Sequence, residues 1–246
     1  MNDPCKPRND VLFEMKGVFA FNQHKRDIWV TGQSAQVLAS ERVLDAGAGD
    51  GRYRRLFSHC EYRTHDFGQE PSTIGRYTAL DYQSDILSIP VADESFDVIL
   101  CTEVLEHVPY PIETVQELAR ILRPGGKLLL TAPLGSFLHQ EPYHYYGGYT
   151  PYWYQKFLPI VGLRVESIER NQGFFSWFAQ EAIRFSTLLD PRRIPRGWRS
   201  IVCFPLWLLT LPLMRLFFPL VALFLDRLGL EQMATVGYHV VARKTP

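Results

Sequence analysis

The chain runs from an apolar segment into a glycine-rich turn at Val43-Leu44-Asp45-Ala46-Gly47-Ala48-Gly49-Asp50-Gly51. Glycine has no Cβ, so it accepts positive φ and lets a ligand lie directly against the backbone. The G-x-G-x-G spacing differs from the G-x-G-x-x-G spacing that holds a dinucleotide pyrophosphate at a helix N-terminus. The stretch therefore predicts a buried strand followed by a turn that suits a nucleoside with a small charged tail.

Acidic residues follow this turn at informative positions. In doubly wound α/β proteins, an acid about 20 residues past the first glycine holds the ribose hydroxyls. Asp66 lies at this distance from Gly47, and Asp85 follows it with an apolar neighbour, Ile86. The carboxyl ends of parallel strands meet at one edge of a sheet, where ligands bind. We therefore expect one crevice to collect the glycine turn, Asp66, Asp85 and Glu103.

Further motifs follow in order: Pro90–Cys101 contains D-E-S-F-D before an apolar strand, Glu103–Val108 reads E-V-L-E-H-V, and Leu122–Leu130 contains R-P-G-G. Together with the glycine turn and the acids, they resemble the class I S-adenosylmethionine-dependent methyltransferases, of the type 11-like group. The resemblance extends from Glu41 to about Arg170. It implies S-adenosylmethionine as cofactor, with Asp45, Gly47, Gly49 and Gly51 around its methionine part, Asp66 on the ribose, Asp85 and Ile86 on the adenine, and Glu103 in the same crevice.

The apolar pattern predicts the fold class. Arg42–Asp45 and Phe96–Cys101 are nearly continuous apolar runs, as in parallel strands that are covered on both faces. Helical patterns at 26–40 and 112–122 alternate with the strands, which indicates a parallel sheet with right-handed crossovers. Two later strands are expected at Leu163–Arg170 and 235–243. We predict an α/β, Rossmann-like, doubly wound seven-stranded sheet with an antiparallel last strand and a helical apolar insertion between strands six and seven.

Length and composition limit the organisation. The 246 residues suit a single methyltransferase domain, with a core at 24–170 plus 232–246 and the insertion at 171–231. The 26 basic and 26 acidic residues balance, so no nucleic-acid partner is expected. Four cysteines without a C-x-x-C pair indicate a reducing compartment, and the polar N-terminus has no apolar signal region. We expect a cytoplasmic protein.

Methyl transfer from a sulfonium requires alignment, exclusion of water and removal of a proton if the acceptor is a hydroxyl. Two histidines are candidates for the base. His107 follows strand four, and His144 belongs to the aromatic loop 137–146 after strand five. The alternatives are that His107 packs a helix against backbone, and that His144 orients the substrate without proton transfer.

The acidic run after strand four raises the question of a metal. Runs similar to Glu103, Glu106 and His107 bind a divalent ion in ubiquinone-pathway O-methyltransferases and in small-RNA 2′-O-methyltransferases. His139 or His144 would have to supply a further ligand. The same letters recur in relatives without metal, and we expect no metal here.

The segment Ile201–Leu225 is the most apolar part of the chain. It holds sixteen Leu, Ile, Val and Phe residues in twenty-five positions, with Arg215 as its only charge. Arginines precede it at positions 192, 193, 196 and 199. Prolines at 205, 212 and 219 favour short kinked helices over one long helix. A single transmembrane span is excluded if the strand at 235–243 completes the sheet, because twenty-five residues cannot cross twice.

Two interpretations of this segment remain: peripheral contact with the cytoplasmic membrane through residues 192–225, or a buried lid or dimer surface. The predicted function is transfer of a methyl group from S-adenosylmethionine to a small or lipid- or glycan-linked acceptor at the cytosolic membrane face. The alternative is a scaffold that keeps the fold without catalysis. A nicotinamide-dependent oxidoreductase is disfavoured, because this chain lacks the G-x-G-x-x-G spacing of such enzymes. The sequence does not indicate the oligomeric state.

Overall fold

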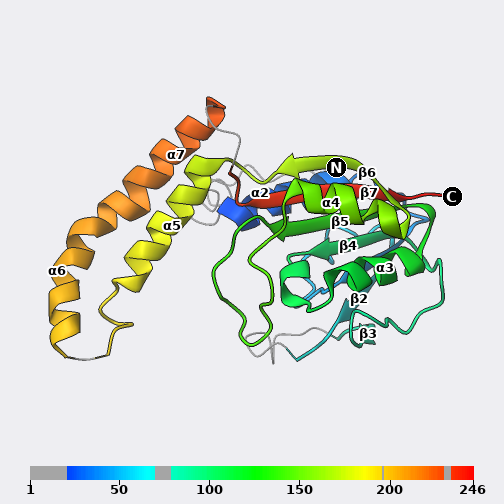
Figure 1. The fold of residues 1–246 in the computed structure, drawn as a ribbon, viewed down its shortest axis with the longest axis horizontal. Coiled ribbons are helices and arrows are strands. Elements are labelled where there is room, and N and C mark those ends of the chain that lie inside the picture. The colour runs from blue at the N-terminus through cyan, green and yellow to red at the C-terminus, as the bar shows by residue number, and fades with distance from the viewer. Residues whose placement is uncertain (1–20, 70–78, 196, 230–233) are drawn as a thin grey trace. The chain divides into compact units, whose positions relative to one another are not determined.

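The computed structural model describes residues 21–69, 79–195, 197–229 and 234–246 (Figure 1). The helices are α2 Phe21–Ser34, α3 Pro111–Ile121, α4 Pro151–Phe157, α5 Phe174–Leu188, α6 Trp198–Pro212 and α7 Phe218–Arg227, with short helical turns at Leu105–His107, Pro159–Val161 and Leu213–Phe217. The strands are β1 Arg42–Ala46, β2 Glu61–Asp66, β3 Tyr82–Gln83, β4 Phe96–Thr102, β5 Leu122–Pro133, β6 Leu163–Arg170 and β7 Gly237–Lys244. The expected helix at 26–40 begins and ends several residues earlier, as α2.

The seven strands form one sheet in the order β3-β2-β1-β4-β5-β7-β6. Strands β1 to β5 pair in parallel, whereas β7 lies antiparallel between β5 and β6. The chain order reverses beside β1, where β2 and β4 flank the first strand. The prediction of a doubly wound sheet with an antiparallel last strand is confirmed.

Alternate side chains of the central strands pack into two hydrophobic cores, one on each face of the sheet. Val43 of β1 and Val98 of β4 pack with Trp29 and Val30 of α2 on one face. Leu44 of β1 lies in the other cluster, with the apolar side of α3 and with Tyr154 of α4. In α3, Pro111 occupies the first turn, where its missing N–H costs nothing, and Val115, Leu118 and Ile121 are fully buried. Because both faces are covered, the strands read as continuous apolar runs.

The described residues divide into two compact units. The core unit contains Ile28–Arg170 and Gly237–Pro246, and therefore the whole sheet. Among the described residues, the helical unit contains 21–27 and those of Asn171–Val236, with α5, α6 and α7. The chain thus leaves the sheet after β6 and returns to it at β7.

The expectation of short kinked helices in the insertion is wrong. Trp198–Arg227 is one uninterrupted helix of 30 residues, made of α6, the π-helical turn Leu213–Phe217 and α7. A proline inside a helix removes one backbone hydrogen bond and crowds the preceding turn. The wider π turn follows Pro212 directly. Such a single π turn shifts the backbone hydrogen-bond pattern around the missing bond, so that the helix continues.

Candidate active site

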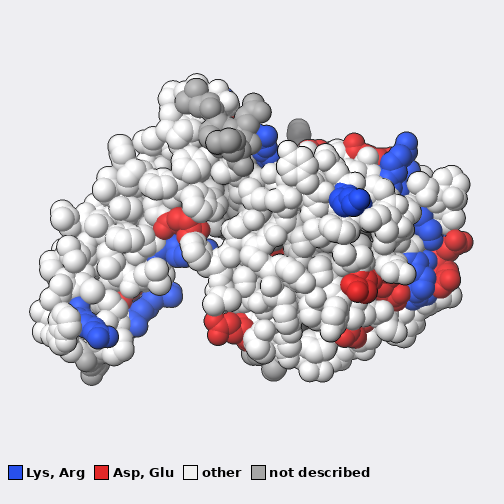
Figure 2. All heavy atoms as spheres, viewed as in Figure 1, with Lys and Arg blue, Asp and Glu red and all other residues white. Residues whose placement is uncertain are grey.

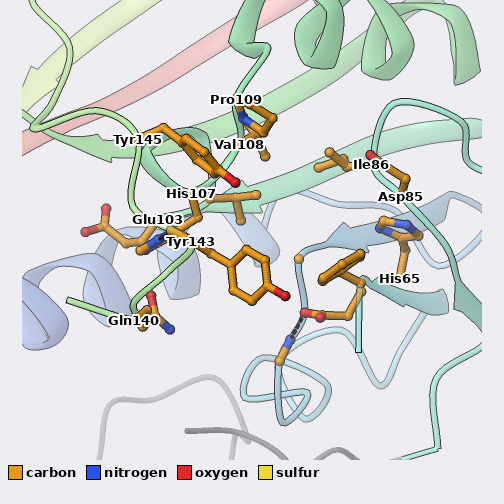
Figure 3. A pocket seen from close by; sticks show the side chains of 15 residues that line it. His65, Asp85, Ile86, Glu103, His107, Val108, Pro109, Gln140, Tyr143 and Tyr145 are labelled. Atoms are coloured by element: carbon orange, nitrogen blue, oxygen red, sulfur yellow. Dashed lines mark hydrogen bonds between the residues drawn. The ribbon is translucent and has the colours of Figure 1, made fainter. Parts of the chain in front are cut away.

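A cavity of about 300 Å³ opens at the carboxyl ends of β1, β2 and β4 (Figure 3). Its lining includes seven of the residues expected from the sequence: Gly47, Gly49, Asp66, Asp85, Ile86, Glu103 and His107. His65, Phe67, Val104, Val108, Pro109, Gln140, Tyr143 and Tyr145 complete it. Asp45, Gly51 and His144 are not part of this lining. The structure therefore brings the glycine turn, the acids and one of the two histidines together.

The glycine turn needs glycine for two different reasons. Gly47, Gly49 and Gly51 have φ angles of 80°, 55° and 71°, a region that L side chains rarely adopt. A Cβ at Gly47 would also collide with the side chain of Val104. At Gly49, which lines the cavity, no atom of the described residues beyond its chain neighbours lies within 4 Å of such a Cβ. Backbone here can meet a ligand directly.

The carboxylate of Asp66 fixes the turn against the end of β2. One oxygen accepts a hydrogen bond from Gly49 N at 2.8 Å, and the other accepts from Gly68 N at 2.8 Å. A carboxylate offers about four acceptor sites, so each oxygen keeps capacity for a ligand hydroxyl. Asp66 thus holds the turn and faces the cavity with the same group.

We expect Asp66→Ala to weaken S-adenosylmethionine binding about 10- to 150-fold, which corresponds to about 1.5–3 kcal/mol for loss of charged hydrogen bonds. Isothermal titration measures this change. Asp81→Ala is the matched control. The carboxylate of Asp81 also accepts a backbone hydrogen bond from β2, from Thr64 N at 2.9 Å, but Asp81 does not line the cavity. Equal affinities for Asp66→Ala and the unmodified protein would contradict the assignment of the ribose site.

Asp45 lies beneath the turn rather than on the cavity surface. Its side chain is buried, Tyr62 donates a hydrogen bond to its Oδ2, and Oδ1 has no partner among the described residues. Burial raises the pKa of Asp45 to about 7, and the Tyr62 hydrogen bond only partly offsets this. The sequence could not separate Asp45 from the cavity-facing acids, since both kinds follow an apolar strand.

Asp45 predicts a pH dependence of stability. Its pKa rises from 3.8 in a solvated chain to about 7 in the folded protein. The folded state therefore holds this proton more tightly, so the contribution is fully present below about pH 4 and is lost as pH rises to about 7. We expect Asp45→Asn to remove this pH dependence, which amounts to a change in the free energy of unfolding on the order of a few kcal/mol between about pH 4 and pH 7. Urea unfolding of both proteins across this window tests it, and parallel curves would contradict it.

His107 is held in one tautomer by the loop that follows β5. Its Nδ1 lies 2.5 Å from the carbonyl oxygen of Tyr143, which can only accept, so Nδ1 carries the proton. Nε2 is left with its lone pair and lies 3.8 Å from Oε1 of Glu106. Burial lowers the pKa of His107, and the neighbouring His139 and His144 lower it further. The imidazole is therefore neutral near pH 7 with a basic nitrogen at Nε2.

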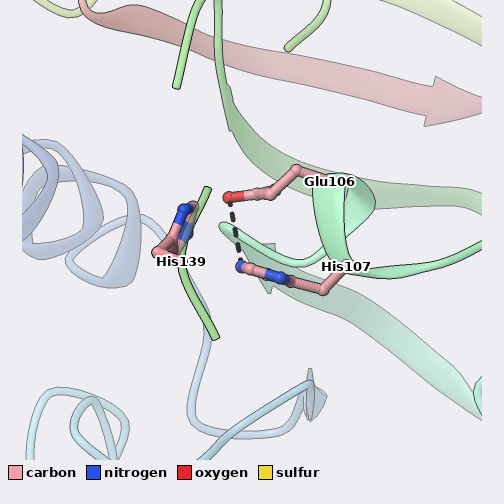
Figure 4. A group of neighbouring side chains, drawn as sticks. All are labelled: Glu106, His107 and His139. Atoms are coloured by element: carbon pink, nitrogen blue, oxygen red, sulfur yellow. Dashed lines mark ion pairs between the residues drawn. The ribbon is translucent and has the colours of Figure 1, made fainter. Parts of the chain in front are cut away.

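Three histidines cluster at this edge. The ring of His139 lies 4.8 Å from that of His107 and 4.6 Å from that of His144. Ligand atoms of Glu106, His107 and His139 all lie within 4.8 Å of one another (Figure 4). Glu103 is not in this group; its Oε1 accepts a hydrogen bond from Thr131 at 2.9 Å. Of the ligands considered from the sequence, Glu106, His107 and His139 therefore come together, and Glu103 does not join them.

His144 is the weaker of the two candidate bases. Its Nε2 lies 3.0 Å from the hydroxyl of Ser136, and it is absent from the cavity lining. The same loop contributes Gln140, Tyr143 and Tyr145 instead, which sequence reasoning did not single out. The aromatic content of residues 137–146 was the available signal. Tyr143 meets Phe67 edge-on across the cavity, with ring centroids 5.6 Å apart.

Comparison with known proteins adds independent findings. A family model described as "Methyltransferase domain" matches residues 22–184. An uncharacterized methyltransferase of Mycobacterium avium is 32% identical over 133 residues, which cover 50% of this chain and 52% of that protein. A ubiquinone biosynthesis O-methyltransferase of Aeromonas salmonicida is 29% identical over 132 residues, 50% of this chain and 55% of that protein. The chain therefore spans about half the length of the curated relatives it matches.

Solved structures show the same fold. A SAM-dependent methyltransferase from Archaeoglobus fulgidus matches with a TM-score of 0.54 and 16% identity, covering 96% of this chain and all (100%) of that one. At this identity the match speaks for the fold alone. It includes the seven-stranded sheet that builds the cavity.

Proposed function

Since the chain belongs to the methyltransferase-domain family of class I S-adenosylmethionine-dependent enzymes, we propose that it transfers the methyl group of this cofactor to a small or lipid- or glycan-linked acceptor at the cytosolic face of a membrane. The observation that carries the proposal is the cavity in which Gly47, Gly49, Asp66 and His107 meet. It joins a surface for the cofactor with a basic nitrogen. The fold by itself would not support this step.

The residues present fit the cofactor. The turn at Gly47 and Gly49 leaves backbone uncovered where the methionine part would lie, and Asp66 keeps acceptor capacity for the ribose. Asp85 and Ile86 line the same cavity further along, in positions suited to the adenine amino group and ring. The bound sulfonium supplies an already activated methyl group, so the protein mainly needs to align the acceptor and exclude water.

His107 provides the proton transfer that a hydroxyl acceptor needs. Nε2 can accept the acceptor proton, while Nδ1–H keeps its bond to the Tyr143 carbonyl. The imidazolium that forms gains the buried carboxylate of Glu106, whose Oε1 lies 3.8 Å from Nε2. The Tyr143 carbonyl thus fixes the ring, Nε2 receives the acceptor proton, and the Glu106 carboxylate stabilises the resulting charge.

The rim of the cavity favours an acceptor with an apolar body. Phe67, Val108, Tyr143 and Tyr145 line it beside His107. A ring or polyisoprenoid-like chain could stack there with its hydroxyl toward Nε2. The name of the Aeromonas salmonicida relative, a ubiquinone biosynthesis O-methyltransferase, is in keeping with such an acceptor. The exposed apolar helix Trp198–Arg227 supports the membrane location, since by length and composition alone it is long and apolar enough to cross a membrane.

Radioactive methyl transfer tests the proposal. The purified protein is incubated with methyl-labelled S-adenosylmethionine and either a lipid extract or a water-soluble metabolite fraction. Label entering the organic phase supports a lipid-linked acceptor, and label entering a water-soluble product supports a small one. Cofactor binding without transfer to either fraction would favour the scaffold alternative and overturn the proposed activity.

A further inference from the structure

The helical unit exposes far more apolar surface than a helix pair needs for its own packing. At about 1.5 Å per residue, the 30-residue helix Trp198–Arg227 is about 45 Å long. Its exposed large apolar side chains are Trp198, Ile201, Val202, Phe204, Leu206, Leu208, Leu209, Leu213, Leu216, Phe217, Leu220 and Phe224. On the face that Figure 2 shows, the surface over α5, α6 and α7 is mostly white, and the blue atoms near the α5–α6 turn are arginines, because this part of the chain has no lysine. Monomeric soluble surfaces rarely carry so large a patch.

Two of the charged groups of this helix, Arg215 and Asp226, are bonded to α5, whereas Arg199 and Arg227 near its ends are exposed. Arg215, the only charge within Ile201–Leu225, donates from Nε to Ser186 Oγ at 2.8 Å and from Nη2 to Thr187 Oγ1 at 2.9 Å. Near its end, Asp226 accepts hydrogen bonds from Phe175 N at 3.2 Å and Ser176 N at 3.0 Å at the start of α5. Within Ile201–Leu225 the one charged side chain is therefore hydrogen-bonded to α5 rather than left among the exposed apolar side chains.

Helix α5 has two different sides. Ser176, Ala179, Ala182 and Ser186 are buried, and their small size lets the two helices approach closely. At 100° per residue, the ion pair between Glu181 and Arg184 falls on roughly the opposite side of α5. A charged side of this kind suits water or headgroups rather than acyl chains. The charge of α5 is confined to this pair, since Phe178, Phe185 and Leu188 of the same helix are also exposed.

The extent of the exposed surface identifies its occupant. Within α6, the exposed side chains from Ile201 to Leu209 spread over about 200° of the circumference at 100° per residue. Packing against another helix uses a stripe of about 100°, whereas a helix half-sunk in a bilayer surface uses about 180°. Beside this surface, Arg199 lies over Trp198 at 5.7 Å and Arg193 is exposed, as at a headgroup boundary.

We propose that the helix Trp198–Arg227 lies in the plane of one bilayer leaflet, with its apolar side in the acyl region and the charged side of α5 toward water. The arginines of the α5–α6 turn would meet anionic headgroups. The insertion begins after β6 and ends before β7, which are neighbouring strands of one sheet. The chain therefore approaches the membrane and leaves it on the same side of the bilayer. The inference rests on the membrane location in the proposed function but not on methyl transfer.

Vesicle binding tests this surface. The full chain is sedimented with phosphatidylcholine vesicles, with and without phosphatidylglycerol. We expect binding that increases with phosphatidylglycerol, and a loss of about tenfold or more in Ile201→Asp/Leu209→Asp, whose target side chains are 74% and 75% exposed. Ile160→Asp is the matched control, because Ile160 is 64% exposed in the core unit and should leave binding unchanged.

Each outcome has a separate meaning, and S-adenosylmethionine affinity checks that every variant is folded. Failure of the unmodified protein to bind either vesicle overturns both the surface and the membrane location, but leaves methyl transfer standing. Unchanged binding in the double aspartate variant overturns this surface alone. A dimer in size-exclusion chromatography that the aspartates dissociate, without vesicle binding, assigns the surface to a second copy. If the double aspartate variant does not fold, quenching of tryptophan fluorescence by brominated lipid is measured instead. The quenched fraction should be smaller in Trp198→Phe than in the unmodified protein, and an equal fraction in both overturns this surface.

Discussion

Gly49→Val should abolish measurable binding of S-adenosylmethionine. Gly49 has a φ of 55°, which a β-branched residue adopts only with strain, and its N–H donates to Asp66 Oδ2. The added side chain would take up open space at the cavity lining, where the described residues leave room for a ligand. Isothermal titration should show no heat of binding at concentrations that saturate the unmodified protein.

Gly125→Val separates backbone strain from the loss of the ligand surface. Gly125 also has a positive φ, 76°, and among the described residues beyond its chain neighbours no atom lies within 4 Å of a Cβ built there. It does not line the cavity. Both variants should lose stability by a similar amount, about 1–2 kcal/mol, but only Gly49→Val should lose the cofactor. Equal cofactor affinity in the two variants would remove the glycine turn from the site.

Local pattern was sufficient to predict the sheet and its ligand edge. An apolar run that ends in glycines leaves few conformations open to the backbone, and parallel strands gather their carboxyl ends at one edge. Gly47, Asp66 and Asp85 therefore reached the cavity as expected, although they are far apart in sequence. The apolar run Phe96–Cys101 was likewise enough to predict β4.

Long-range packing decided what the sequence could not. Asp45 differs from Asp66 only because Tyr62, on the neighbouring strand, closes over it and leaves it buried. His107 differs from His144 because a carbonyl 36 residues away fixes its ring. Neither contact has a signature in the local pattern of residues.

The long helix illustrates a third kind of limit. Three prolines predict interruptions when each is considered alone, since each removes a hydrogen bond. The structure retains one helix because a π turn follows Pro212 and the hydroxyls of α5 hold Arg215. Tertiary contacts thus override the local preference. They also hold Arg215, the only charge within Ile201–Leu225, against α5, which no periodicity of the sequence indicates.

His107→Ala should lower kcat by about 10²–10⁴ while the affinity for S-adenosylmethionine holds, if the acceptor is a hydroxyl. The substitution removes the lining imidazole whose Nδ1 bonds the Tyr143 carbonyl and whose Nε2 lies 3.8 Å from Glu106 Oε1. His144→Ala should cost less than tenfold, since that side chain hydrogen-bonds Ser136 outside the lining. Steady-state kinetics on the acceptor found by methyl labelling measures both.

His107→Asn distinguishes proton transfer from positioning. An Asn side chain can still donate a hydrogen bond to the Tyr143 carbonyl, but it cannot accept a proton at pH 7. We therefore expect Asn to be as inactive as Ala; recovery of activity would make His107 a positioning residue. Because the pKa of His107 is lowered below 6.5, kcat of the unmodified enzyme should rise through a pH below that value and stay level above it. Loss of activity with a chelator, restored by Mg²⁺, would instead make Glu106, His107 and His139 metal ligands, because an imidazole nitrogen bound to a cation cannot take the acceptor proton.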